Sequence, residues 1–298
     1  MIGELSGLHY QAYQMAHHMA LEAQAAWAYE KAIDMPTYIG NGHWNSATKG
    51  LLAGEHLQLS LQQLEKGYMD KNELRLEVTK TISLRQLLGD ADFLTQLKTG
   101  SLSFNINEAN LDEDYAGHYC RQIHTITVSI PAVLGPYQDF HATLQQMSDM
   151  VLLKPDPKAI DFLYGLLMPK AGGNGNGKAS AALAPAVPEA LAGSIRQNYR
   201  PQQQVAISTG QNDSGMFSLS FAEGRYLPFE GTGVLSSWQL QLHDLQKKKG
   251  PKLNISDVIV RIHYTALHSG GAFEQHVHQK VAAYQEALQP AQAAVHAN

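Results

Sequence analysis

The sequence predicts an α+β protein, in which an N-terminal α-helical hairpin precedes an antiparallel β-sandwich domain with a flexible Gly/Ala/Pro insertion. Before residue 70, apolar residues recur every three or four positions, which is the period of a helix. After residue 70 they alternate with polar residues, which is the period of a strand with one buried face. Turn-forming residues separate the alternating segments and few helical stretches intervene, as is typical of an antiparallel sandwich.

Residues 1–70 are assigned to the helical hairpin. The first helix is expected over residues 5–34, and Pro36 ends its pattern. The second helix is expected to start at a cap formed by Asn45 or Ser46. Its stripe predicts a seam against the first helix or against another subunit. The stripe consists of Gly50, Gly54, Leu57, Leu61, Leu64 and Tyr68.

Residues 71–268 are assigned to the sandwich. The first strand lies between Leu74 and Leu84, where Lys80 is the exception among the apolar positions. Ser83 is expected to cap a short helix that Gly100 ends. Further strands are expected at residues 102–106, 126–130, 141–153, 204–209, 216–222, 235–243 and 256–265.

Two segments depart from this pattern. Residues 169–193 are rich in Gly, Asn, Ala and Pro, which predicts an exposed flexible insertion. Within it, residues 172–179 resemble a phosphate-binding loop, but Ala179 replaces the Ser or Thr that holds magnesium, so a linker is favoured. Residues 269–298 are expected to form either a docked helix or a loose tail, and Pro290 is expected to end any helix.

Composition limits the partners. The net charge is −5 with 22 Lys and Arg, so the chain has no broad basic field for nucleic acid or an anionic membrane. Charged residues make up only 16% of the chain, which favours association with other chains. The N-terminus lacks the features of a signal peptide, and no apolar run reaches the 18 residues of a spanning helix. We therefore expect no direct membrane insertion by this chain alone.

Several residues invite a catalytic or metal-binding interpretation that the pattern does not favour. Cys120 is expected to be a buried, inert thiol in a strand. His276 and His278 point apart on a helix, so they make a poor metal pair. The acidic pairs Asp112 with Asp114 and Asp213 with Glu230 are expected at turns. We predict no enzyme, no catalytic residue, no cofactor and no metal site.

The most informative segment runs from residue 210 to 231. Gln211-Asn212-Asp213-Ser214-Gly215 is turn-forming, and Phe217, Leu219 and Phe221 then alternate with serines until Pro228 blocks a central strand. This turn, together with Tyr226-Leu227-Pro228-Phe229-Glu230-Gly231, resembles the C-terminal region of the A subunit of bacterial insecticidal toxin complexes (Tc toxins), including its TcB-binding domain.

Other phrases resemble the same family in the same order, over roughly residues 7 to 266. They are Leu51-Leu52-Ala53-Gly54-Glu55, Leu76-Glu77-Val78-Thr79-Lys80-Thr81-Ile82-Ser83-Leu84, Ile130-Pro131-Ala132-Val133-Leu134-Gly135-Pro136-Tyr137 and Ser256-Asp257-Val258-Ile259-Val260-Arg261-Ile262-His263-Tyr264-Thr265. The resemblance implies a non-enzymatic docking module that binds the B component of a hollow B–C payload shell. It also implies a pentameric A subunit and a secreted, extracellular location, although a signal peptide is not recognisable.

The resemblance places candidate partner contacts in the loops at residues 210–215 and 225–231. The residues are Asn212, Asp213, Arg225, Tyr226, Phe229 and Glu230. Phe229 is expected to be either an apolar anchor for the partner or a buried residue that fixes the turn. The receptor-binding regions, shaft and membrane-entering tip of the family are not in this sequence, so we expect no pore from this chain alone.

Two other functions stay open at this point. A stand-alone β-sandwich that binds carbohydrate would need Trp238, Tyr226 and Tyr137 exposed on one face, whereas the alternation with Leu240 and Leu242 places Trp238 in the core. A hydrolase would need two carboxylates that converge in one cleft.

Overall fold

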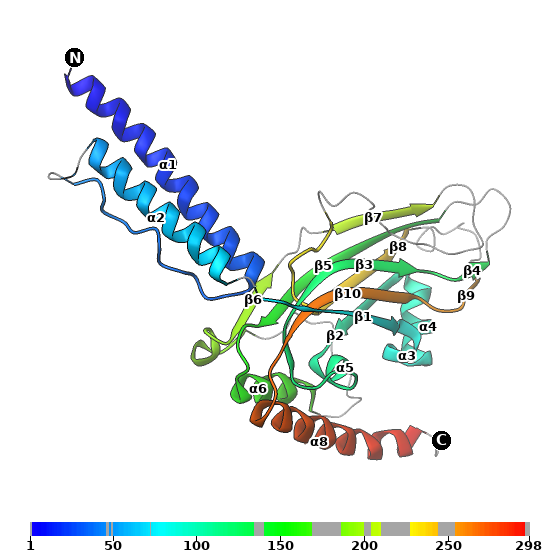
Figure 1. The fold of residues 1–298 in the computed structure, drawn as a ribbon. Helices are drawn as coiled ribbons and strands as arrows, with labels where there is room; N and C mark the ends of the chain where they lie inside the picture. Colours follow the sequence, from blue (N-terminus) through cyan, green and yellow to red (C-terminus); the bar gives the residue numbers. More distant parts are fainter. Residues whose placement is uncertain are drawn as a thin grey trace. The chain divides into compact units, whose positions relative to one another are not determined.

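The computed structural model describes residues 2–45, 48, 50–71, 73–133, 140–168, 186–199, 204–209, 227–243 and 254–295. The chain divides into two compact units, Met1–Leu74 and Arg75–Asn298. The first unit is helical and the second contains the antiparallel sheets, so the predicted α+β class is confirmed (Figure 1). The predicted domain limits at residues 70 and 268 stay predictions.

The N-terminal unit contains two long helices, α1 (Ile2–Lys31) and α2 (Leu51–Asp70), that run in the same direction (Figure 1). Near the C-terminal ends of both helices, the Tyr68 hydroxyl donates to Glu30 at 3.0 Å and the rings of Trp27 and Tyr68 lie 6.1 Å apart. A hairpin would bring opposite ends together. The prediction of a hairpin is therefore wrong in the direction of the second helix.

The segment between the two helices explains this arrangement. Residues 32–50 connect the helices, and the described residues 32–45 run back along α1, where the side chain of Gln24 accepts hydrogen bonds from the backbone N–H groups of Tyr38 and Ile39. An extended chain of this length spans up to about 60 Å, whereas α1 is only about 45 Å long. The connection is thus long enough to start α2 beside the beginning of α1.

The expected cap of the second helix is also corrected. Gly50 occupies the N-cap position of α2 and makes no side-chain hydrogen bond there. Asn45 instead accepts a hydrogen bond from the backbone N–H of Thr48 at 3.0 Å, and Ser46 lies outside the described residues. Asn45 therefore stabilises a turn before α2 and does not cap the helix itself.

Two antiparallel sheets form the second unit (Figure 1). The first has the strand order β1 (Leu76–Ser83), β10 (Ile259–His268), β3 (His118–Ser129). The second has the order β2 (Ser101–Ile106), β8 (Leu235–Leu242), β5 (Phe140–Leu152), β6 (Ile195–Tyr199), and β7 (Gln204–Thr209) also pairs with β5. A short pair consists of β4 (Ala132–Val133) and β9 (Asn254–Ile255).

Most predicted strands are present, with small shifts at their ends, and the strand at 204–209 has the expected bounds. The expected strand at 216–222 and the loop at 172–179 lie outside the described residues. The strand β6 and the helices α5 (Glu108–Asp112) and α6 (Pro157–Leu167) were not predicted. Residues 169–185 of the expected insertion are not described, but residues 186–193 contain the 3-10 turn η1 (Glu189–Leu191) and bury Leu191. The expected insertion therefore extends too far.

The predicted cap at Ser83 is present. Its hydroxyl accepts from the backbone N–H of Gln86 at 3.1 Å and starts α3 (Leu84–Leu88). Gly89, with φ of 81°, separates α3 from α4 (Asp90–Thr99), and Gly100, with φ of 71°, ends α4. The positive φ at both positions suits glycine, which has no Cβ to clash. One predicted helix is thus two.

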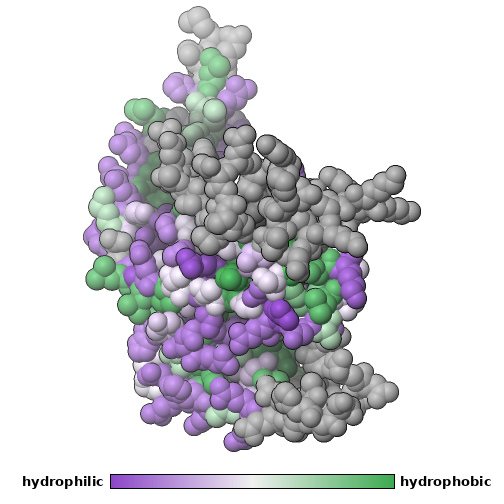
Figure 2. Space-filling model, turned by 90° about the vertical axis from the view of Figure 1, so that its right-hand side faces the viewer, coloured by the Kyte–Doolittle hydropathy of each residue, from purple (hydrophilic) through white to green (hydrophobic). Residues whose placement is uncertain are grey.

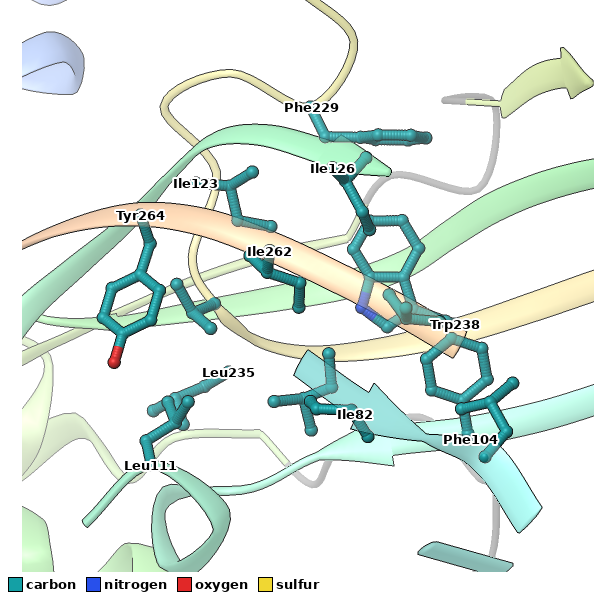
Figure 3. Packing of buried hydrophobic residues seen from close by; sticks show 14 of the residues in the cluster. Ile82, Phe104, Leu111, Ile123, Ile126, Phe229, Leu235, Trp238, Ile262 and Tyr264 are labelled. Carbon is teal, nitrogen blue, oxygen red and sulfur yellow. The ribbon is translucent and has the colours of Figure 1, made fainter. Parts of the chain in front are cut away.

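The inner faces of both sheets share one hydrophobic core. Trp238 lies within it, with its ring centroid 4.8 Å from that of Phe229 and 6.4 Å from that of Phe104 (Figure 3). Its indole N–H donates to the hydroxyl of Ser236 at 2.6 Å, which satisfies the one polar atom of the ring. Lys80, the exception in the β1 pattern, pairs with Asp114 at 2.6 Å. An inward-pointing charge on an edge strand disfavours pairing with another chain.

The C-terminal segment is a docked helix, α8 (Ala272–Val295), and not a loose tail. Phe273 and Val277 are buried against the sandwich. On α6, Asp161 binds His276 at 2.7 Å and Lys280 at 2.9 Å. The helix continues past Pro290, so the expectation that this proline ends it is wrong. Among the described residues, no helix is both long enough and apolar enough to span a membrane.

If α8 is an integral part of the second unit, Val277→Ala should lower the free energy of unfolding by about 1–3 kcal/mol, because two buried methyl groups are lost. His278→Ala, at an exposed position one residue away, should change it by less than about 0.5 kcal/mol. Urea unfolding of both variants measures the difference. Equal stability of the two variants would contradict the docked position of α8.

Candidate functional site

Two of the predicted partner contacts, Phe229 and Glu230, lie in a turn that precedes β8. We define this turn as residues 227–233. Asn212, Asp213, Arg225 and Tyr226 lie outside the described residues, so their place in the site stays a prediction.

Backbone hydrogen bonds attach the turn to β3. The N–H of Gly231 donates to the carbonyl of Ile123 at 2.9 Å, and the N–H of Ile123 donates to the carbonyl of Thr232 at 2.8 Å. One step further, the N–H of Val234 donates to the carbonyl of Arg121 at 3.2 Å. The turn is therefore an addition to the edge of the first sheet, because β3 is the outer strand there.

Two buried polar side chains, Thr232 and Asp149, stabilise the turn on the side that faces the core. The Thr232 hydroxyl donates to the carbonyl of Phe229 at 2.6 Å, and the carboxylate of Asp149 accepts from the N–H of Gly233 at 2.9 Å. Gly233 also lies close to β5, where an added Cβ would stand 2.0 Å from the carbonyl oxygen of Met150. Buried, satisfied hydrogen bonds of this kind favour a single conformation.

Phe229 faces inward from the turn and is completely buried. Its ring packs edge-on against Trp238 (Figure 3). Its backbone φ is 67°, a value that is unfavourable for a bulky residue. The core contact and the hydrogen bonds of the turn together offset this strain. The packing favours the alternative in which Phe229 fixes the turn.

Glu230, the next residue, points the other way. Its side chain is 48% exposed and lies 3.5 Å from the ring of His124, which is 56% exposed. His124 was not predicted, because in sequence it is only a polar residue in a strand. Glu230 of the turn and His124 of β3 thus present a carboxylate and an imidazole side by side at the surface.

A charged cluster lies behind this part of β3. Arg121 donates to Glu108 and to Asp112, each at 2.7 Å, and to the carbonyl of Tyr115 at 2.9 Å. The Tyr164 hydroxyl donates to Asp112 at 2.9 Å. Arg121, Glu108 and Asp112 are each only 3% exposed. The prediction of a hydrated turn is therefore wrong for Asp112, which the arginine and the tyrosine hold in the interior.

Burial dominates the protonation of this cluster. It raises the pKa of Glu108 to about 8, although the nearby guanidinium of Arg121 acts in the opposite direction. Burial likewise raises the pKa of Asp112, against the same guanidinium. Burial lowers the pKa of the neighbouring His118, so this imidazole is neutral over more of the pH range. At neutral pH the cluster therefore binds a proton that the same residues would release in water.

A family model described as the Tc toxin complex TcA C-terminal TcB-binding domain matches residues 1–266 of the chain. The chain belongs to this family. The resemblance identified from the sequence is confirmed, over nearly the range that the sequence phrases cover.

Relatives support the assignment to the TcB-binding domain family. Toxin subunit YenA2 of Yersinia entomophaga is 36% identical over 285 residues, which are 95% of this chain and 19% of that relative. The structure of Morganella morganii TcdA4 aligns with a TM-score of 0.56 at 26% identity, over 89% of this chain and 11% of that one. The structure of Yersinia pseudotuberculosis TcaA-TcaB aligns with a TM-score of 0.54 at 30% identity, over 90% of this chain and 14% of that one. The chain thus spans about one fifth or less of these relatives.

The other sequence candidates differ in their surroundings within this member of the TcB-binding domain family. Cys120 is buried, as expected. Trp238 is 1% exposed, so it is not part of an exposed aromatic platform for a sugar, and Tyr137 and Tyr226 lie outside the described residues. His276 pairs with Asp161, and His278 is exposed. Within the described ranges, no group of three or more His, Cys, Asp or Glu side chains is arranged to hold a metal ion.

If Phe229 fixes the turn, Phe229→Ala should lower the free energy of unfolding by about 3–5 kcal/mol, as is usual for a large aromatic removed from a core. Glu230→Ala, at the exposed position next to it, should change it by less than about 0.5 kcal/mol. Thermal and urea unfolding measure both. An unchanged melting temperature for Phe229→Ala would contradict a core role and would restore this residue as a partner anchor.

Proposed function

We propose that this chain is a non-enzymatic docking module that binds the TcB-like component of a toxin B–C shell and helps to assemble the translocation-competent holotoxin. The match of residues 1–266 to the TcB-binding domain family is the observation that carries the proposal. The rigid turn at 227–233 supports it, because a preformed contact loses little conformational entropy when a partner binds. The proposed site of action is extracellular, as for a toxin component.

The proposed contact residues flank and include this turn. Glu230 is the described member with an exposed side chain, and Asn212, Asp213, Arg225 and Tyr226 precede it in the sequence. Hydrophilic residues cover much of the described surface in the lower half of Figure 2. Interfaces between components that also exist apart are about as apolar as the rest of a protein surface, so a face of mixed hydrophilic and hydrophobic residues suits such a partner.

We also propose that the chain associates with copies of itself through the N-terminal unit, as the pentameric family implies. Most of the large apolar side chains that are exposed among the described residues lie in Met1–Leu74. Leu51 is 80% exposed, Met15 is 70% exposed and Leu8 is 64% exposed. A concentration of exposed apolar side chains marks an interaction surface. A ring of copies then presents the same turn several times, so that weak contacts combine.

Docking is tested by capture of the chain on an immobilised B–C shell. The wild-type chain should bind, and Glu230→Ala should weaken binding about tenfold, the effect of losing one significant contact. Glu77→Ala removes an exposed carboxylate from β1 and is the matched control, with unchanged binding expected. A wild-type chain that ignores the shell would contradict the docking function. Equal binding by all three would contradict only the role of Glu230.

Self-association is tested separately by native mass spectrometry of the chain without the shell. A five-fold oligomer is expected, and the double variant Met15→Gln, Met19→Gln should shift it towards monomer because apolar contact area is lost. Leu166→Gln, an exposed apolar position in the second unit, is the control that should leave the oligomer intact. A wild-type chain that stays monomeric at all concentrations would contradict association through this unit.

A further inference from the structure

The buried cluster contains one positive charge for two carboxyl groups. Arg121 contacts both Glu108 and Asp112, and all three side chains are almost completely removed from solvent. If both acids were ionised, the interior would contain one uncompensated negative charge. Burying an unpaired charge is strongly unfavourable, so the folded cluster retains a proton instead.

The hydrogen bonds assign this proton to Glu108. Asp112 accepts from Arg121 through one oxygen and from the Tyr164 hydroxyl through the other, so both of its oxygens are stabilised as a carboxylate. Glu108 accepts from Arg121 through one oxygen, and its second oxygen has no hydrogen-bond partner among the residues that the structure describes. Glu108 is therefore the acid that the protein stabilises less well as an anion.

The groups that face Glu108 keep their charge while it titrates. Arg121 stays protonated, burial raises the pKa of Tyr264 to about 12, and burial also raises the pKa of Tyr164. The lowered pKa of His118 keeps that imidazole neutral above pH 7. Asp114, just after α5, already pairs with Lys80. The charged and titratable neighbours are His118 and Arg121 from β3, Tyr264 from β10, Tyr164 from α6, and Asp112 and Tyr115.

The cluster is enclosed where three helices meet. Glu108 and Asp112 are both on α5, Tyr164 is on α6, and α8 contacts both of these helices. The ring of Tyr284 on α8 lies edge-on to the ring of Tyr164, with centroids 6.2 Å apart. Helix α8 therefore covers the elements that keep water from the cluster.

We propose that Glu108, Asp112 and Arg121 form a proton-controlled latch, in which loss of the one retained proton at alkaline pH loosens helix α8 from α5 and α6. The second carboxylate created by this loss finds no further cation among the groups that face it. Water can reach it once α8 moves outward. The charge is then relieved without unfolding the two sheets, which contribute only Arg121 to the cluster.

The direction of the pH effect follows from the pKa of Glu108. In the folded chain it is about 8, compared with 4.5 as its ordinary value. The folded state therefore binds the proton more tightly than the unfolded state. Its contribution to stability is complete below about pH 4.5 and is progressively lost as the pH rises towards and beyond 8. Opening should appear on the alkaline side and not on the acidic side.

Amide hydrogen exchange of the full chain, followed by mass spectrometry between pH 7 and 9.5, tests the latch. After correction for intrinsic exchange rates, protection of α8 in the wild-type chain should fall about tenfold per pH unit above pH 8. Glu108→Gln keeps the carbonyl acceptor for Arg121 but cannot ionise, so its α8 should stay protected. Glu77→Gln changes an exposed carboxylate and should behave like the wild-type chain.

Equal loss of protection in the wild-type chain and in Glu108→Gln would overturn the latch, and so would constant protection of the wild-type chain up to pH 9.5. Infrared titration of the wild-type chain gives a test that needs no variant, should Glu108→Gln fail to fold. A protonated carboxyl band at pH 7 that disappears with a midpoint near 8 is expected. Absence of that band at pH 7 would equally overturn the proposal.

Discussion

Three consecutive residues of β3, Arg121 to Ile123, hold the two polar structures on which the second unit depends. The backbone of Arg121 and Ile123 binds the turn at 227–233, and the Gln122 side chain donates to the carbonyl of Gly231 at 3.1 Å. The Arg121 guanidinium binds the carboxylates of α5. The register of β3 is therefore fixed, because a shift by one residue would exchange its buried and exposed side chains and break the bonds to both the turn and α5.

The irregular geometry of β3 explains how neighbouring residues of this strand bind both the turn and the cluster. Its register with β10 shifts twice, between His263 and Tyr264 opposite His124 and between Thr265 and Leu267 opposite Cys120 and Arg121, and Cys120 has a positive φ of 54°. A β-bulge re-aims the side chains that follow it. His124 consequently points to solvent beside Glu230, while Arg121, Gln122 and Ile123 are all buried. With Cys120, four consecutive residues are buried, which the usual alternation of a strand does not produce, so the strain at Cys120 is tied to the position of the arginine.

The sequence predicts what depends on local pattern and misses what depends on distant partners. Alternation located most strands, Ser83 and Gly100 marked the ends of helices, and the leucines beside Trp238 placed that ring in the core. The parallel course of α2 was missed because an extended return segment has no periodic signal. Asp112 was placed at a hydrated turn because its arginine is supplied by β3 and its tyrosine by α6. The sequence left two roles for Phe229, a partner anchor or a buried residue that fixes the turn. Only its contact with the ring of Trp238 shows that it faces the core.

The separation between the turn and the cluster bears on how a docking domain would be regulated. Both are attached to the same residues of β3, yet they use different side chains: the turn is held by backbone bonds and by Thr232 and Asp149, whereas the cluster depends on Glu108. Within the described part of the chain, Glu108 forms its hydrogen bond with Arg121 and none with the turn. Coupling between two sites requires an element with two arrangements that both sites favour differently. Helix α8 contacts α5 and α6 and forms no hydrogen bond with the turn among the described residues. A change at the cluster would therefore alter how α8 packs on α5 and α6, while the surface at Glu230 stays fixed.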